Sequence, residues 1–334
     1  MPDPTRIMDM ASAFYQSQVL FTASDLGLFG TLAEHGPATA ATVADAAGLD
    51  PRGTRLLLDA CVALNLMQKD REHYSNTPEA DTFLVPGAAG DLSRALRYNR
   101  DVYDAWGKLP ELVRTGSPVE APAVHLGDDP ERTRAFVLSM HGRALGIGRM
   151  VVPQLDLADG ATILDIGGGP GTYSALIAQA LPQARCTVLD LPAVVDVARE
   201  LLQDQGVADR VHVLPGDYHT TDLPADNDVV LFFGMLHQES PADIQALLTR
   251  ACTALKPGGT VYVMDMMTDA THTQPVFSAL FAVNMALTTA NGWVFAADEL
   301  EGWLAAAGFV DTDISPLPPP MPHWLARARK PDRP

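Results

Sequence analysis

The residues with the clearest chemistry form a glycine-rich segment in the middle of the chain. Residues 162–166 are apolar or β-branched apart from Asp165, which is the profile of a strand buried on both faces. Four glycines follow, Gly167, Gly168, Gly169 and Gly171, and a helical pattern begins at Thr172. Glycines let the backbone pass close to a ligand, and a helix N-terminus offers unpaired N–H groups. The segment therefore predicts a nucleotide-binding corner.

The spacing of these glycines narrows the choice of nucleotide. Dinucleotide-binding folds use Gly-x-Gly-x-x-Gly, whereas single residues separate Gly167, Gly169 and Gly171. The spacing and Asp217 argue against a NAD-dependent oxidoreductase. A second predicted strand, 186–189, ends in Asp190, whose carboxylate is placed to bind two ribose hydroxyls. A third, 211–214, leads to Asp217 and Tyr218, an acid and an aromatic ring able to hold an adenine.

A histidine follows the fourth predicted strand. This strand spans residues 228–233, and His237 comes just after it. Ligands of open α/β sheets bind at the carboxyl ends of the strands. A neutral imidazole at that place can accept a proton from a hydroxyl group. We expect His237 to act as a general base.

These blocks together resemble the class I S-adenosylmethionine-dependent methyltransferases. The matching segments are 165–171, 189–192, 216–217, 236–237 and 255–259. More narrowly, nearly the whole chain is similar to the small-molecule O-methyltransferases, which include caffeic acid, acetylserotonin and bacterial polyketide O-methyltransferases. The resemblance implies S-adenosyl-L-methionine as the cofactor. The residues expected to bind it are Asp165, Gly167, Gly168, Gly169, Gly171, Asp190, Leu191, Asp217, Tyr218 and Phe233.

The resemblance also implies how the catalytic residues are arranged. His237 matches the catalytic histidine of the family, which two carboxylates flank, and Asp265, at the end of the fifth predicted strand (260–265), matches the first of them. The second position falls near Val294, which cannot serve. The family's Asp-Trp-Ser-Asp after the histidine is replaced by Gln-Glu-Ser-Pro at 238–241. Whether Glu239 substitutes for the missing acid stays open.

The acceptor is expected to be a small, aromatic or polyketide-like hydroxyl compound of secondary metabolism. The residues expected to bind it are Trp106, Met140, His141 and Met285. The alternative is a C-methyltransferase of the bacteriochlorophyll or α-keto-acid type. The keto-acid type holds a metal with two histidines, and the only downstream candidate, His272, matches poorly. No metal site is therefore expected.

Composition excludes several other classes of function. The chain has 334 residues, of which 47% are hydrophobic, enough for two domains. Its net charge of −18 argues against a nucleic-acid or membrane partner, and so against a winged-helix regulator. Three scattered cysteines, Cys61, Cys186 and Cys252, indicate a reducing compartment. No signal peptide or membrane-length apolar run is evident, so we expect a cytoplasmic protein.

The order of helical and strand patterns predicts the architecture. Two helices are expected over 5–35, a winged helix over 36–85 with a hairpin at 67–74, and one helix over 92–113. Strands and helices alternate after residue 160, and a final pair near 310–314 and 324–329 completes the set. The predicted fold is α/β, a Rossmann-like seven-stranded methyltransferase domain preceded by a helical, winged-helix dimerisation domain.

Three regions follow from this order. Residues 1–100 are expected to form the dimerisation domain, 101–153 a helical linker that lines the substrate pocket, and 154–334 the catalytic domain. The apolar residues of the first helices need a partner surface. In the family resembled, such helices form a homodimer, and we expect one here.

Overall fold

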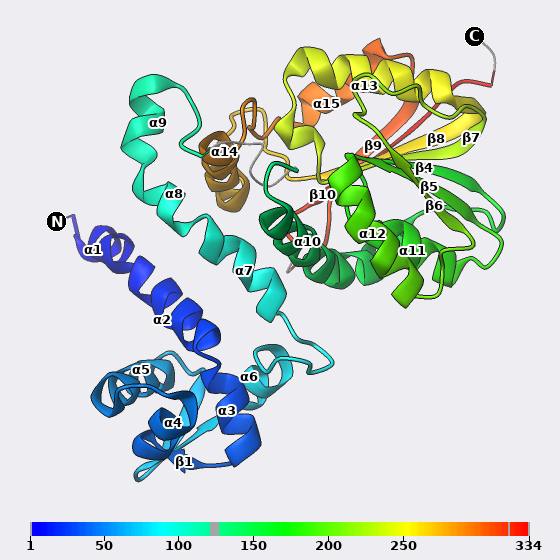
Figure 1. Cartoon of the computed structure of the whole chain (residues 1–334). Coiled ribbons are helices and arrows are strands. Elements are labelled where there is room, and N and C mark those ends of the chain that lie inside the picture. The colour runs from blue at the N-terminus through cyan, green and yellow to red at the C-terminus, as the bar shows by residue number, and fades with distance from the viewer. Residues whose placement is uncertain (1, 121–126, 320, 333–334) are drawn as a thin grey trace. The chain divides into compact units, whose positions relative to one another are not determined.

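The computed structural model describes residues 2–120, 127–319 and 321–332. The chain divides into two compact units, Met1–Arg100 and Asp101–Pro334 (Figure 1). Within the described residues, no helix is both long and apolar enough to cross a membrane.

The N-terminal unit is largely helical. Its three short strands form an antiparallel sheet in the order β1-β3-β2. The predicted hairpin is present, and β1 is an addition to it. The elements are α1 (Thr5–Ser12), α2 (Phe14–Asp25), α3 (Leu28–His35), β1 (Ala38–Thr39), α4 (Ala40–Ala47), α5 (Pro51–Ala63), β2 (Met67–Asp70), β3 (His73–Asn76), α6 (Pro78–Phe83) and α7 (Ser93–Asp101).

Local sequence explains where these helices begin. Asp50 caps α5 by accepting the N–H of Gly53 at 2.7 Å, and Pro51 occupies the first helical turn. The prediction of two helices over residues 5–35 was wrong, because there are three. The chain breaks at Ala13 and again at Gly27, whose φ of +67° lies in the left-handed region that favours glycine.

The single helix predicted over 92–113 was also wrong. The chain instead forms α7, α8 (Tyr103–Gly107) and α9 (Leu109–Thr115). Pro110 lacks the N–H that would continue the helical ladder from Trp106, so a new helix begins at Leu109. The long helix α10 (Pro130–Val151) begins at the Asp129 cap. The prolines and glycine of the segment before this helix predict a loop over 122–130, which lies partly outside the described residues.

The C-terminal unit contains the predicted seven-stranded sheet, in the order β6-β5-β4-β7-β8-β10-β9. The strands run parallel except β10, which is antiparallel to both of its neighbours. Their bounds are β4 (Thr162–Ile166), β5 (Arg185–Asp190), β6 (Val211–Pro215), β7 (Asn227–Phe233), β8 (Leu255–Asp265), β9 (Val310–Pro316) and β10 (Trp324–Arg329).

Helices cover both faces of this sheet (Figure 1). On one face α13 and α15 pack against alternate residues such as Leu164 and Val230. On the other, α10 and α11 pack against Ile163 and Leu231, and α10 also contacts α12. The remaining bounds are α11 (Thr172–Ala180), α12 (Pro192–Asp204), α13 (Pro241–Ala254), α14 (Val276–Thr288), α15 (Ala297–Ala306) and the short 3-10 helices η2 (Val152–Gln154) and η3 (Leu236–Gln238).

The direction in which successive strands are added to the sheet reverses after β6. After β4 the chain adds β5 and β6 on one side, then crosses back to place β7 on the other side of β4. In an open α/β sheet, a ligand binds outside the carboxyl ends of the strands at such a switch point. The topology therefore places the glycine turn and His237 at the edge of the sheet where such ligands bind.

Candidate active site

The turn after β4 has a backbone that requires glycine. Gly167, Gly169 and Gly171 all adopt positive φ values, +65°, +54° and +70°. A Cβ atom on Gly168 would lie 2.6 Å from the carboxylate carbon of Asp165. The N-terminus of α11 follows directly, so the turn presents main-chain N–H groups at the edge of the sheet.

Two carboxylates support this turn. Asp190 Oδ2 accepts the Gly169 N–H at 2.7 Å, and Asp190 Oδ1 accepts the Leu191 N–H at 2.8 Å. Asp165 is fully buried and accepts the Ser174 hydroxyl at 2.7 Å through Oδ2, while its Oδ1 has no hydrogen-bond partner. Burial raises the pKa of Asp165 to about 7 and that of Asp190 to about 6. The predicted residues of the first two strand ends thus lie together.

The loop after β6 carries Asp217 and Tyr218, the acidic and aromatic residues predicted at this strand end. Asp217 is exposed and accepts the His219 N–H at 2.8 Å. The guanidinium of Arg250, on α13, donates to the main-chain oxygens of Tyr218, His219 and Thr221. Phe233, at the end of β7, is buried and contacts Tyr173 edge to face, with ring centroids 5.1 Å apart.

His237 and Asp265 form a buried pair at the ends of β7 and β8. The Nδ1–Oδ1 distance is 2.6 Å, and Asp265 Oδ2 also accepts the His237 main-chain N–H at 3.2 Å. Asp265 is 1% exposed and its Oδ1 additionally accepts the Met266 N–H at 2.8 Å. An Nδ1–H donated to a carboxylate leaves Nε2 as the ring nitrogen that can accept a proton. The geometry is that of an oriented base.

Sequence reasoning missed several residues around this pair. The Phe281 ring, on α14, meets the His237 ring edge to face at 5.3 Å, and the Arg143 guanidinium of α10 lies 6.0 Å from the Phe281 centroid. His323 is buried, its Nδ1 has no hydrogen-bond partner, and burial together with Arg143 lowers its pKa to about 4. No local motif marks these residues, because distant segments bring them together.

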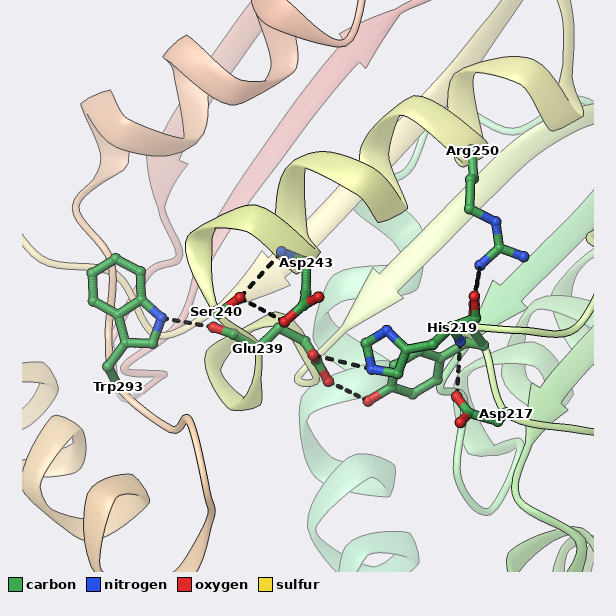
Figure 2. Close-up of polar contacts among 8 residues, drawn as sticks. Asp217, His219, Glu239, Ser240, Asp243, Arg250 and Trp293 are labelled. Carbon is green, nitrogen blue, oxygen red and sulfur yellow. Dashed lines mark hydrogen bonds and ion pairs between the residues drawn. The ribbon is translucent and has the colours of Figure 1, made fainter. Parts of the chain in front are cut away.

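Glu239 does not occupy the place of the missing second acid. Its Oε1 accepts the Tyr218 hydroxyl at 2.6 Å, and its Oε2 lies 3.2 Å from His219 Nε2 (Figure 2). Its main-chain oxygen accepts the Trp293 indole N–H at 2.8 Å. Val294, the aligned position of the second acid, is a buried apolar residue. Asp265 is thus the carboxylate that the structure places on the His237 ring.

The four residues predicted for the acceptor are distributed over three helices. Trp106 on α8 donates its indole N–H at 2.8 Å to Asn284 on α14, next to the buried Met285. Met140 and His141 lie half-buried on α10. His141 Nδ1 lies 2.8 Å from Thr172 Oγ1, so this histidine contacts the first residue of α11. Trp106 therefore contacts α14 at the residue before Met285, and His141 contacts the start of α11 beside the glycine turn.

Neither a metal site nor a disulfide is found in the described part of the chain. No group of three or more histidine, cysteine or acidic residues there is arranged to hold a metal ion. His272 lies beside Thr268 and Glu299 instead. Cys61, Cys186 and Cys252 are free thiols, the first two buried.

Comparisons with known proteins cover both units. The family model of the O-methyltransferase domain matches residues 119–310, and that of the O-methyltransferase dimerisation domain matches residues 8–86. The tetracenomycin polyketide synthesis 8-O-methyl transferase TcmO of Streptomyces glaucescens is 34% identical over 98% of this chain and 97% of its own. The 3-hydroxy-5-methyl-1-naphthoate 3-O-methyltransferase of Streptomyces sahachiroi is 31% identical over 91% and 89%. The structure of human N-acetylserotonin methyltransferase in complex with SAM aligns with a TM-score of 0.88, at 28% identity, over 99% of each chain.

Proposed function

This chain belongs to the O-methyltransferase family and is an S-adenosylmethionine-dependent methyltransferase, and from this premise we propose that it methylates a hydroxyl of a small aromatic or polyketide-like acceptor. His237 is the general base in this proposal. The observation that carries it is the 2.6 Å contact between His237 Nδ1 and Asp265 Oδ1 at the carboxyl ends of β7 and β8. Family membership favours O-methylation over the carbon methylation, hydride transfer and DNA binding weighed from the sequence.

The corner at the ends of β4 and β5 suits this cofactor chemically. S-Adenosylmethionine is a cation. Asp165 is buried, Asp190 is partly buried, and the charge of Asp190 disfavours the ionisation of Asp165. Each oxygen of Asp190 accepts a single N–H, so lone pairs remain for ribose hydroxyls. The unpaired Oδ1 of Asp165 is a buried acceptor in need of compensation. We assign Asp190 to the ribose, and Asp217 and Tyr218 to the adenine end.

The chain's own contribution to the reaction is to orient two groups and remove one proton. The bound cofactor supplies an activated methyl group on a sulfonium. His237 Nε2 accepts the hydroxyl proton of the acceptor, since Nδ1 is held by Asp265. Asp265 then stabilises the resulting imidazolium through the same contact. The edge-to-face contact with Phe281 limits rotation of the His237 ring, so the base keeps its direction.

The environment of His237 favours a flat aromatic acceptor. Phe281 packs on the histidine, and α14 also carries Met285 and Asn284, the latter holding Trp106 from α8. Aromatic rings and thioethers contact the faces of other rings well. TcmO and the naphthoate enzyme are named for a polyketide and an aromatic hydroxyl compound. These observations support the same class of acceptor here.

We also propose that the working unit is a homodimer formed through the N-terminal helices. Ile7, Met8 and Met10 of α1 are each about 60% exposed, and Phe14 and Tyr15 of α2 are also exposed. An exposed apolar surface of this kind marks an interaction site. The match of residues 8–86 to a dimerisation domain supports a second copy of the chain as the partner.

The test is a methylation assay with labelled S-adenosylmethionine and a panel of hydroxylated aromatic and polyketide compounds. We expect product with the label on oxygen, located by mass spectrometry and NMR. The matched control is the same panel with each hydroxyl already methylated, which should give no labelled product. Label on carbon or nitrogen, or transfer that is unchanged in His237→Ala, would contradict the proposed reaction.

A further inference from the structure

A buried acidic residue links two loops that the sheet keeps apart. Glu239 is 6% exposed and follows η3, directly after the catalytic histidine segment. Its carboxylate contacts Tyr218 and His219, which belong to the loop after β6. We call this three-residue contact, Tyr218–Glu239–His219, the clasp (Figure 2). A buried carboxylate with two polar partners is well compensated, so the clasp is a built feature of the fold.

The sheet order makes the clasp a long bridge. β6 and β7 are separated by β5 and β4 in the order β6-β5-β4-β7. Neighbouring strands lie about 4.8 Å apart, so the two strands whose loops meet in the clasp are separated by about 14 Å. The strands between them end in Asp190 and in the glycine turn. A connection from β6 to β7 at the carboxyl edge must therefore pass beside these two strand ends.

Both ends of the bridge are held independently of the carboxylate. Arg250 fixes the main chain of Tyr218, His219 and Thr221. On the other side, Trp293 donates its main-chain N–H to His237 at 2.9 Å and its indole N–H to the main chain of Glu239 at 2.8 Å. Removing the Glu239 side chain would thus open the clasp while the two loops keep their other supports.

We propose that Glu239 is a positioning residue that closes the adenosine side of the cofactor site by holding Tyr218 and His219 across it. The proposal rests on the placement of the cofactor given above. The clasp fixes the Tyr218 ring beside the ribose carboxylate Asp190, and it limits escape of the bound nucleoside. In this proposal Glu239 raises cofactor affinity, whereas the Asp265–His237 pair removes the hydroxyl proton of the acceptor.

The test measures S-adenosylhomocysteine binding by calorimetry and its release by stopped flow. Glu239→Ala should weaken binding about tenfold or more, because tenfold is the lower end of the effect of losing a hydrogen bond to a charged group. The weaker binding should appear as faster dissociation. Tyr218→Phe keeps the ring and removes only its hydroxyl, so it should weaken binding by a smaller factor. Glu239→Gln, which retains an acceptor for Tyr218, should restore part of the loss. The Glu239→Ala/Tyr218→Phe double variant should bind no more weakly than Glu239→Ala alone.

A neighbouring carboxylate provides the control. Asp243 accepts from Ser240 at the start of α13, four residues beyond Glu239, and makes no contact in the clasp (Figure 2). Asp243→Asn should lower the thermal midpoint and leave binding within about twofold. Unchanged binding in Glu239→Ala, or a fall in kcat at saturating cofactor that exceeds the loss of affinity, would overturn the proposal. If Asp190→Ala still weakens binding in that case, only the clasp fails and the cofactor placement stands.

Discussion

Replacing Asp265 by asparagine tests the base assignment more sharply than removing the histidine. The carboxylate accepts three hydrogen bonds, from the His237 ring, the His237 main chain and the Met266 main chain. Asparagine keeps the shape but has one acceptor oxygen and a donor amide. If the amide faces the ring, it donates to Nδ1, and the ring proton moves to Nε2. His237 then has no free acceptor for the proton of the hydroxyl group.

The size of the effect follows from the charge that Asp265 supplies. A full charge at 4 Å contributes about 4 kcal/mol at an effective dielectric constant of 20, and the distance between His237 Nδ1 and Asp265 Oδ1, 2.6 Å, is shorter. Each 1.36 kcal/mol of activation free energy is a tenfold change in rate. Loss of the imidazolium stabilisation alone therefore lowers kcat by about a factor of 1,000. This lies inside the range of about 100 to 10,000 typical of general base catalysis.

Two measurements check this reasoning. Initial rates at saturating cofactor, with a hydroxyl acceptor found in the panel, should fall by about that factor in Asp265→Asn. Nitrogen chemical shifts of the labelled imidazole should show the tautomer change without any acceptor present. Asp269→Asn is the control, because that carboxylate accepts only from the loop after β8. An Asp265→Asn variant that folds, binds S-adenosylhomocysteine and retains kcat within threefold would refute the assigned base.

Four further outcomes are expected. His237→Ala should lower kcat at least as far as Asp265→Asn, within the range of about 100-fold to 10,000-fold. It should leave S-adenosylhomocysteine affinity in calorimetry unchanged, and a variant that turns over normally would contradict the base assignment. Asp190→Ala should weaken that affinity by about 2–3 kcal/mol, and unchanged affinity would refute the ribose contact. Burial raises the Asp165 pKa to about 7, so the folded state disfavours the ionised form. As pH rises from 4 to 7, the free energy of unfolding of the cofactor-free wild type, measured with urea, should therefore fall by about 1.4 kcal/mol per pH unit relative to Asp165→Asn. A constant difference between the two proteins would exclude the pKa shift. Phe14→Glu should shift the average mass measured by light scattering from the dimer toward the monomer, whereas Val310→Glu, on the edge strand β9, should not. A wild type that is monomeric at micromolar concentration would contradict the dimer.

The sequence predicted the sheet better than the helices. β4 is a buried, largely apolar run followed by glycines, and β10 ends in alternating alanines and arginines; both match their predicted bounds. Helix boundaries depend on a few backbone positions instead. The breaks at Ala13 and Val102 have no glycine or proline at the break itself, and apolar spacing continues through both. Helices α14 and α15 were not predicted, since α14 is apolar nearly all round and shows little helical periodicity.

The site divides in the same way. Asp190 and His237 could be placed from sequence because each follows directly from a recognisable strand. Phe281 and His323 could not, because tertiary packing alone brings α14 and the segment before β10 to the histidine. Glu239 was named from its position, but its direction required the loop after β6 to be located. Side-chain direction across loops is a property of packing that no local pattern encodes.

The position of β10 determines when the sheet of the C-terminal unit can be completed during synthesis. β10 pairs with β8 along its whole length, with Trp324 opposite Asp265, and separates β8 from β9. While the chain is being synthesised, β8 remains an open sheet edge until residues 324–329 have left the ribosome. An unpaired apolar edge is a site of wrong pairing and aggregation. The strand that carries the carboxylate partner of His237 is thus protected only by residues translated well after it, and a nascent chain stalled before them would hold an unfinished sheet.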